Sequence, residues 1–270
     1  MSNDLTFDRR DGFSPESSAR SLRRASGVQC RRILVGWSRD PVTLLQALVY
    51  PALMVFLFWL VLGSTPNSGA PSSYGLVPMV ALVGAMSGAS ISGLGLQRER
   101  DNGQLAKMWA LPVHRSSAMV GRLCAESIRI LVTVAFVLLV GAVVGFRIDT
   151  GVPGGLAVLA IALGFGLSFS VMITAFALLA GDTRIVEWTA IGTNVALFFN
   201  SGFVPVASYP SWLQPIIEYQ PLSCAVDAIR AVAAGLDVTK PLLLTAAWSV
   251  GAALAFAPAA IRGYRAAVVR

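Results

Sequence analysis

The sequence has few of the side chains from which soluble enzymes and metalloproteins build their sites. It contains one histidine and two lysines. Its three cysteines lie in separate segments without the spacing of metal ligands: Cys30, Cys124 and Cys224. Neither a zinc site nor a disulfide framework is therefore predicted. Because no cluster of His, Asp and Glu and no nucleophile–base pair stands out, we expect no catalysis, metal or cofactor in this chain.

Charged residues are also scarce, at 13% of a chain that is 55% hydrophobic and has a mean hydropathy of +0.68. Five long runs contain no Asp, Glu, Lys or Arg: residues 41–97, 130–146, 150–181, 188–217 and 241–261. A helix needs roughly 20 apolar residues to cross a bilayer core, so the first run is long enough for two crossings and each other run for one. The sequence therefore predicts an all-α polytopic membrane protein with six transmembrane helices.

The basic residues are distributed unevenly along this topology. The net charge is +7, and eight arginines precede the first uncharged run. Five basic residues lie within residues 97–122, one at Arg184 and three within residues 262–270. If both termini lie on one side of the membrane, that side carries 17 of the 21 basic residues. This asymmetry follows the positive-inside rule, so we expect a multi-pass plasma-membrane protein with both termini in the cytoplasm and no nucleic-acid partner.

Residues 1–40 are expected to form a cytoplasmic N-terminal tail and interfacial helix, and residues 41–270 the six-helix transmembrane domain. Between residues 18 and 39, apolar side chains with helical spacing lie beside arginines: Cys30, Ile33, Leu34 and Trp37. This pattern is typical of an amphipathic helix at the lipid headgroups. The alternative is a basic tail with an ordinary aromatic anchor.

Within the predicted spans, three features affect helix packing. Pro51 is expected to kink the first span. Small residues at four-residue spacing in the second span would allow close backbone approach, including approach by a second copy: Gly84, Gly88 and Ser92. At the start of the third span, Arg122, Glu126 and Arg129 stack on one helix face, where we expect them to pair and to extend toward the membrane surface.

A basic, amphipathic segment at residues 97–122 separates the second and third predicted spans. Asp101 or Asn102 would cap a short helix that ends before Pro112. This helix presents an apolar stripe flanked by basic residues: Leu105, Met108 and Trp109, beside Arg98, Arg100 and Lys107. The stripe fits either a groove on a cytoplasmic partner or the membrane interface, and periodicity does not separate the two.

A second unusual stretch covers residues 205–240. It is too apolar for a solvated loop, yet prolines interrupt it at Pro210, Pro215 and Pro221. Two short helices are predicted near residues 211–219 and 222–234, each too short to cross a bilayer. Such segments are typical of re-entrant or interfacial elements, here on the external face.

These two stretches resemble one family. RERDNGQLAKMWALPVHRSSAMVGR is similar to the cytoplasmic coupling-helix loop of ABC transporter type-2 permeases, and GFVPVASYPSWLQPIIEYQPLSCAVDAIRAVAAG is similar to that family's second signature. LPVHRSSAM and YPSWLQPIIEYQPLS resemble the daunorubicin-resistance permeases of actinobacteria, a subfamily that includes a mycobacterial member linked to the export of complex lipids.

The resemblance implies a membrane subunit that works with an ATP-binding cassette ATPase dimer, on which ATP and Mg would be bound, and with a second permease chain, identical or a sister subunit. It implies export of hydrophobic compounds, drugs or lipids. By position, the resemblance implies ATPase coupling for Arg98, Glu99, Arg100, Leu105, Met108, Trp109 and Pro112. It implies an external gate at Pro205, Trp212, Gln214, Pro215 and Pro221.

The resemblance does not assign residues to a substrate path. Asn194, Phe198 and Asn200 bring aromatic and amide groups to the fifth predicted span and are candidates to line it. The alternative is that the phenylalanines pack against lipid and the asparagines bond neighbouring helices.

Two rival functions are an ion-coupled secondary carrier and a membrane scaffold that transports nothing. A phosphate-binding loop of the form G-x-x-x-x-G-K-[ST] is missing, so the chain itself is not expected to hydrolyse ATP. Ion-driven carriers usually bind the coupling ion well inside a span. Here the charges near spans lie close to predicted ends: Glu126, Arg129, Asp149 and Glu187. Ion coupling is therefore disfavoured.

Overall fold

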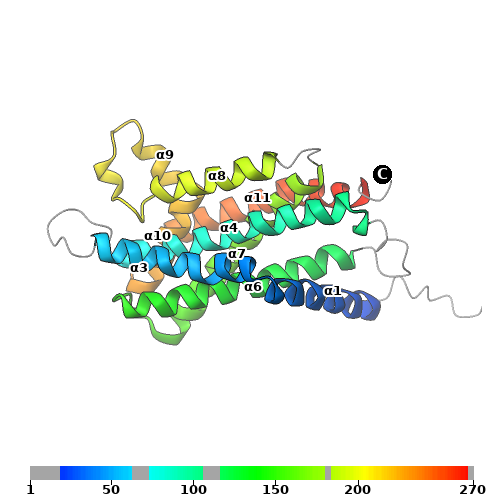
Figure 1. Ribbon diagram of the computed structural model, residues 1–270. Helices are drawn as coiled ribbons and strands as arrows, with labels where there is room; N and C mark the ends of the chain where they lie inside the picture. The colour runs from blue at the N-terminus through cyan, green and yellow to red at the C-terminus, as the bar shows by residue number, and fades with distance from the viewer. Residues whose placement is uncertain (1–18, 63–72, 106–115, 180–183, 267–270) are drawn as a thin grey trace, which may run out of the picture.

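Figure 1 shows a computed structural model of the chain, in which long helices run roughly side by side. The structure describes residues 19–62, 73–105, 116–179 and 184–266. These residues form helices and connecting turns without a β-strand. Five of the described helices are long and apolar enough to cross a membrane: Pro41–Val61, Ser73–Asp101, Ser117–Val143, Gly151–Leu179 and Thr239–Tyr264. The prediction of an all-α multi-pass membrane protein is confirmed.

The first described element is α1 (Ala19–Arg39), a helix without an acidic residue that packs along α6 (Ser117–Val143). Asp40 ends α1 and caps α2 (Pro41–Leu44): its carboxylate accepts hydrogen bonds from the Val42 N–H at 3.1 Å and the Thr43 hydroxyl at 2.6 Å. The hydroxyl bond, which stabilises the charged form, holds the pKa of Asp40 below its usual value. The cap separates α1 from the first membrane segment.

The first membrane segment is irregular near Pro51, as the sequence predicted. A π-helical turn, η2 (Leu45–Val49), joins α2 to α3 (Tyr50–Leu62). Pro51 has no N–H to donate to the turn that precedes it, and this turn is η2. Prolines and π-helical turns are both common causes of a bend in a helix. Only 11% of the residues in the most apolar stretch of this segment are buried, so most of its surface faces outward.

The centre of the bundle is α4 (Ser73–Asp101), which packs against α3, α6, α7 (Gly151–Leu179), α8 (Arg184–Phe198) and α10 (Pro221–Ala234). In its most apolar stretch 78% of the residues are buried. The corresponding share for α11 (Thr239–Ala266) is 6%, although α11 packs along α7 and α10. The peripheral helices therefore turn most of their apolar surface away from the chain.

The small-residue face of α4 is filled by side chains of this chain. A Cβ on Gly84 would lie 3.1 Å from Pro51, and one on Gly88 would lie 1.7 Å from Nη1 of Arg129. The Ser92 carbonyl accepts a hydrogen bond from Arg122 at 2.6 Å. The predicted close approach of backbones, or of a second copy, at this face is therefore wrong, because Pro51 and two arginines occupy the space.

Backbones do meet closely at the start of α4. A Cβ on Gly75 would lie 2.5 Å from the carbonyl oxygen of Gly202, and a Cβ on Gly202 would lie 2.7 Å from that of Gly75. Gly202 belongs to the irregular segment that follows α8. This contact fixes the segment against α4.

The turn between α6 and α7 uses two glycines with positive φ, Gly145 and Gly151. It is bonded to the end of α10: the Asp149 N–H donates to the Ala233 carbonyl at 2.8 Å, and the Thr150 hydroxyl donates to the Val232 carbonyl at 2.9 Å. The turn and the end of α10 therefore support each other.

The fifth predicted span differs from the structure. We expected a crossing at residues 188–204, but α8 has 15 residues and ends at Phe198, so it is not among the five long apolar helices. The reason is local, because the side chain of Asn200 bonds the end of the helix and turns the chain. The two short helices expected between the prolines are present as α9 (Gln214–Tyr219) and α10, preceded by a 3-10 turn, η3 (Val206–Ser208).

The Gly75–Gly202 contact gives a first prediction. Alanine normally stabilises a helix more than glycine does. Here, however, Gly75→Ala would push a methyl group into the carbonyl of Gly202, which is a backbone group with little freedom to move. We expect Gly75→Ala to destabilise the purified protein by about 1 to 3 kcal/mol, the usual range for overpacking. Thermal unfolding in detergent measures this. Gly164→Ala is the matched control, because a Cβ there meets nothing within 4 Å; equal stability of the two variants would contradict the prediction.

Candidate functional site

Two ends of the bundle can be distinguished in Figure 1. At one, which we call the α1 end, lie α1, the last turn of α4, the first turns of α6 and the end of α11. At the other, which we call the α9 end, lie α9, the start of α4 and the turn between α6 and α7. The residues expected to couple to an ATPase belong to the α1 end.

Three of the expected coupling residues, Arg98, Glu99 and Arg100, lie in the last turn of α4 and not in a loop. The chain then turns at Gly103, whose φ is +68°, and becomes helical again at residues 104–105. The remaining expected coupling residues Met108, Trp109 and Pro112 lie outside the described residues. Most of the predicted short helix lies outside the described residues, so it stays a prediction.

Leu105 does not belong to an exposed stripe. Its side chain is 2% exposed and packs in a cluster with Leu96, Ile173, Val186 and Tyr264. The sequence pattern placed Leu105 on the docking face of the predicted helix, and this part of the prediction is wrong. Leu105 instead fastens the segment after α4 to the bundle.

Glu99 connects three helices. Its Oε1 lies 3.1 Å from Nη2 of Arg32 on α1, and its Oε2 lies 3.5 Å from Nη1 of Arg122 on α6. Arg122 also donates to the Ser92 carbonyl at 2.6 Å and to the Ser92 hydroxyl at 3.2 Å. The carboxylate therefore holds α1 and α6 together at the end of α4.

Arg100 connects α4 to α7 in the same region. Its Nη1 donates to the carbonyls of Ala177 at 3.0 Å and Leu178 at 3.3 Å, in the last turn of α7, and its Nε pairs with Asp101 at 2.9 Å. A cation that bonds the last carbonyls of a helix also interacts favourably with the helix dipole. Arg98 is exposed and makes no such contact in the described residues.

A cleft of about 430 Å³ opens at this network, between α1, the first membrane segment, α4 and α6. Its charged lining comes from Arg32, Asp40, Arg98, Glu99 and Arg122. The α1 end thus offers a polar cleft that is lined by four elements and includes the Glu99 network in its lining.

Deeper along α6, Glu126 and Arg129 form a buried ion pair at 2.7 Å, with side chains 3% and 6% exposed. Arg129 also donates to the Ala85 carbonyl at 3.1 Å. The pairing was predicted, but the expected extension of Arg122 and Arg129 toward the membrane surface is wrong. Both guanidinium groups lie against α4 because its small residues leave room for them.

At the α9 end, the irregular segment after α8 is held first by the amide of Asn200. Asn200, which is fully buried, donates through Nδ2 to the carbonyls of Ala196 and Leu197 at 2.9 and 2.6 Å. Its Oδ1 accepts from the N–H groups of Gly202 and Phe203 at 2.8 and 3.0 Å. Every polar atom of this amide is thus used to close the helix end.

Further bonds tie this segment to α10. The Ser201 hydroxyl donates to Asp227 at 2.9 Å, and its N–H donates to the Ser223 hydroxyl at 3.1 Å. Gln220 donates to the Phe199 carbonyl and to the Ser223 hydroxyl. The start of α10 and the end of α8 therefore form one unit.

The expected gate residues have separate positions. Gln214 donates to the Tyr209 carbonyl at 2.9 Å, and Trp212 is 71% exposed. The prolines stand where helices begin: Pro205 precedes η3, Pro215 is in the first turn of α9, and Pro221 starts α10. Their arrangement is compatible with the start-of-helix preference of proline.

The expected substrate-path residues do not meet around one cavity. Asn194 donates to the Ala190 carbonyl of its own helix at 2.9 Å, and the side chain of Asn200 bonds the end of α8 and the turn that follows it. Phe198 is half exposed and stacks edge-on against Phe203, with 5.5 Å between ring centroids. The alternative that the asparagines bond neighbouring helices is not met either, because the side chains of Asn194 and Asn200 bond their own segments.

An apolar cavity of about 580 Å³, which the sequence analysis missed, lies between α4, α7, α8, α10 and α11. We call it the bundle cavity. Aromatic and methionine side chains form much of its wall: Met86, Phe165, Phe169, Met172, Trp248 and Phe256. Ser249 also lines it, and its buried hydroxyl has no hydrogen-bond partner within the described part of the chain. The spacing Phe165, Phe169, Met172 was a signal in the sequence, but the walls come from five elements that only the fold brings together.

The described residues therefore define a polytopic helical membrane protein with an apolar cavity in its bundle and an ionic network at one end. They contain no group of three or more His, Cys, Asp or Glu side chains placed to hold a metal ion. The chain belongs to the ABC-2 type transporter family, whose sequence pattern matches residues 27–233. The resemblance noted in the two motifs is thereby confirmed.

Three relatives illustrate this membership. The chain is 36% identical to the probable doxorubicin resistance ABC transporter permease protein DrrC of Mycobacterium tuberculosis, over 93% of this chain and 91% of that protein. It is 25% identical to the daunorubicin resistance ABC transporter permease protein DrrB1 of Streptomyces coeruleorubidus, over 87% and 83%. It is 26% identical to the putative transport permease ycf38 of Pyropia yezoensis, over 74% and 70%.

The buried ion pair gives a second prediction. Removing one partner of such a pair leaves an uncompensated charge, so we expect Glu126→Ala to destabilise the protein by about 3 to 5 kcal/mol. Replacing both charges, in Glu126→Ala with Arg129→Met, is expected to recover most of this loss, because the orphaned guanidinium is gone. Thermal unfolding in detergent compares the variants. A double variant no more stable than Glu126→Ala would show that the loss does not come from the unpaired Arg129.

Proposed function

We propose that this chain is the membrane-spanning permease subunit of an ATP-driven exporter that moves hydrophobic compounds outward across the plasma membrane. Membership of the ABC-2 family supports the subunit role, and two relatives are named as permeases of doxorubicin and daunorubicin resistance. The observation that carries the substrate class is the bundle cavity, which offers aromatic rings, thioethers and few polar groups. Such a lining suits an amphiphilic drug or a complex lipid.

The proposed topology has six crossings, with α8 as the fifth. In Figure 1, α8 starts near the α1 end and runs toward the α9 end, and α11 returns. Its 15 residues cover about 22 Å, less than the roughly 30 Å of a bilayer core. The bonded segment around Asn200 would complete the crossing, since irregular backbone is tolerated at membrane depth where its polar groups are satisfied within the protein. The excess of basic residues at the α1 end favours a cytoplasmic position for that end and for both termini.

On this topology, the α9 end is external. The segment from η3 through α10 would then form re-entrant elements, with the prolines and Trp212 at the external gate. Gln214 would hold the turn before α9. Opening such a gate requires breaking hydrogen bonds between the end of α8 and α10, such as those of Ser201 and Gln220 with Ser223 and that of Ser201 with Asp227.

ATP and Mg would be bound by a dimer of separate ATP-binding cassette subunits, which would contact the α1 end. Movement of residues 98–112 by the ATPase would reach α1 and α6 through Glu99, and α7 through Arg100. This is two-state gating biased by nucleotide. The chain itself would supply no catalytic group.

A second permease chain, identical or a sister subunit, would complete the transporter. The outward apolar faces of the first membrane segment and of α11 are available for such pairing or for lipid. Large exposed side chains mark both faces: Leu53, Phe56, Leu57 and Leu60, and Leu243, Val250 and Leu254.

The coupling role predicts the behaviour of Glu99. In vesicles that contain the chain and its ATPase, we expect Glu99→Gln to lower drug-stimulated ATPase activity by about fivefold or more, corresponding to a coupling free energy of about 1 kcal/mol. Trp109→Ala is expected to act in the same direction. Glu187→Gln is the matched control, since Glu187 is exposed on α8 and has no ion pair in the described residues. Membrane insertion should be normal in all variants.

Two results would contradict this proposal. Normal stimulated activity in both Glu99→Gln and Trp109→Ala would remove the α1 end as the coupling region. Failure of any ATP-binding subunit to co-purify with the folded, tagged chain from its native membrane would remove the motor-driven function, and dependence of transport on an ion gradient would then be measured.

The substrate cavity is tested by filling it. Ala252 lines the bundle cavity, whereas Leu156 on α7 is exposed and does not line it. We expect Ala252→Phe to weaken the export of doxorubicin from vesicles about tenfold, because a pocket contact of this size contributes about 1 to 3 kcal/mol. Leu156→Phe should leave export unchanged. If instead Asn194→Leu or Phe198→Ala changes cargo preference and Ala252→Phe does not, the path runs along α8.

A further inference from the structure

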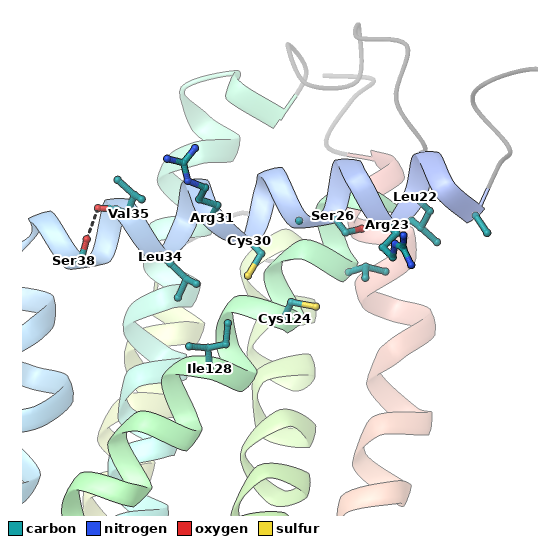
Figure 2. Close-up of a pocket in the computed structure, with 13 residues that line it drawn as sticks. Leu22, Arg23, Ser26, Cys30, Arg31, Leu34, Val35, Ser38, Cys124 and Ile128 are labelled. Carbon is teal, nitrogen blue, oxygen red and sulfur yellow. Dashed lines mark hydrogen bonds between the residues drawn. The ribbon is translucent and has the colours of Figure 1, made fainter.

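A groove of about 820 Å³ lies between α1 and α6, outside the bundle cavity and the Glu99 network (Figure 2). Much of its lining is apolar: Leu22, Leu34, Val35, Val120 and Ile128. The helices touch at Gly121, where a Cβ would lie 2.6 Å from the side chain of Gln29. Figure 2 shows Cys30 and Leu34 directed toward the side of α6 that carries Cys124 and Ile128.

The rim of this groove is cationic. Arg23 and Arg31 line it, and the helix that carries them contains no acidic residue. Neither arginine has an ion pair within the described residues, whereas the adjacent Arg32 is bonded to Glu99. Figure 2 shows Arg31 extending away from the apolar floor. The groove therefore combines an apolar slot with positive charge at its edge.

One polar group points to a ligand inside the groove. Ser26 lines it and is 5% exposed, and its hydroxyl has no hydrogen-bond partner in the described residues. A buried hydroxyl without a partner is destabilising unless a ligand or water satisfies it. Ser26 follows Arg23 by nearly one helical turn, so both lie on one side of α1.

We propose that this groove binds an anionic phospholipid of the surrounding membrane, with an acyl chain along the floor between Leu34 and Ile128 and the phosphate at Arg23 and Arg31. The Ser26 hydroxyl would donate to an ester oxygen of the lipid. An acyl chain needs no hydrogen bonds, which suits a floor with so few polar groups. A peptide would bring backbone N–H and C=O groups that this floor cannot satisfy.

The site would also affect the α1 end. Arg31 contacts the groove and Arg32 contacts Glu99, so a lipid that fixes α1 would favour the position from which Arg32 reaches Glu99. This consequence for ATPase activity depends on the proposed function, whereas lipid binding itself does not.

Cys124 provides a direct reporter. It is exposed and lines the groove, whereas Cys30 and Cys224 are buried. Burial also raises the pKa of the Cys30 thiol, which keeps it protonated and slow to react. In the purified full chain in detergent, we expect added phosphatidylglycerol to slow maleimide labelling of Cys124, and an equal amount of phosphatidylcholine to have little effect.

Different variants test the cationic rim and the apolar lining of the groove. Arg23→Gln with Arg31→Gln is expected to require about 30-fold more phosphatidylglycerol for the same protection, since each arginine near an anionic lipid contributes about fivefold. Arg24→Gln with Arg39→Gln is the matched control, because these exposed arginines do not line the groove. Gly27→Phe should fill the groove and abolish lipid protection, since a Cβ there meets no atom within 4 Å. Ser26→Ala is a smaller change in the same groove, which removes only the hydroxyl group.

Equal protection by phosphatidylcholine and phosphatidylglycerol would overturn the proposal, as would absence of protection by either lipid. An equal loss of affinity in the Arg24/Arg39 control would also overturn it, because the effect would then reflect the total charge of α1. Protection by phosphatidylglycerol together with loss of stimulated ATPase in Glu99→Gln supports both proposals. Protection without any ATPase partner retains the lipid site and removes the exporter.

Discussion

Two arginines of α6 must find acceptors inside an apolar bundle, and the packing of the central helices follows from this requirement. A buried guanidinium without partners is strongly destabilising. Glu126 and the Ala85 carbonyl serve Arg129, while Ser92 and Glu99 serve Arg122. Three of these acceptors belong to α4, which can present them because Gly88 leaves space above the helix backbone. The small residues of α4 therefore accommodate charged side chains, which fixes how far apart α4 and α6 lie.

The two ends of the bundle are held together by different chemistry. At the α1 end, charged groups such as Glu99 and Arg100 join helices through ion pairs and bonds to helix-end carbonyls. At the α9 end, amides and hydroxyls such as those of Asn200 and Thr150 bond irregular backbone, and the one ion pair between elements in the described residues there, Lys240 with Glu218, is exposed. Uncharged groups lose less free energy than charges when they leave water. The α9 end can therefore contain turns at or near membrane depth, where backbone must be satisfied internally.

The uncharged runs were enough to predict an all-helical membrane protein, because the lack of charge over 20 residues reports the lipid environment directly. They could not predict where α8 ends, since that depends on the side-chain bonds of Asn200. Nor could they predict that Leu105 is buried, or that Arg122 and Arg129 lie against α4. Hydropathy shows that a helix is apolar but not which face meets lipid and which meets a neighbour. The bundle cavity was missed for the same reason, because five elements contribute to its wall.

The exposure of the ion pairs determines where this structure can move most readily. Glu126 and Arg129 are almost fully buried, so separating them would leave two charges without water. Glu99 and Arg32 are 27% and 42% exposed, and exposed pairs contribute only about 0 to 1 kcal/mol because water replaces the lost partner. A force applied to the end of α4 would therefore change the Glu99 contacts first, while the α4–α6 contact at Arg129 stays intact. Under the proposed function, α1 and the last turn of α4 would rearrange against a fixed α4–α6 pair, and the buried pair would act as the pivot.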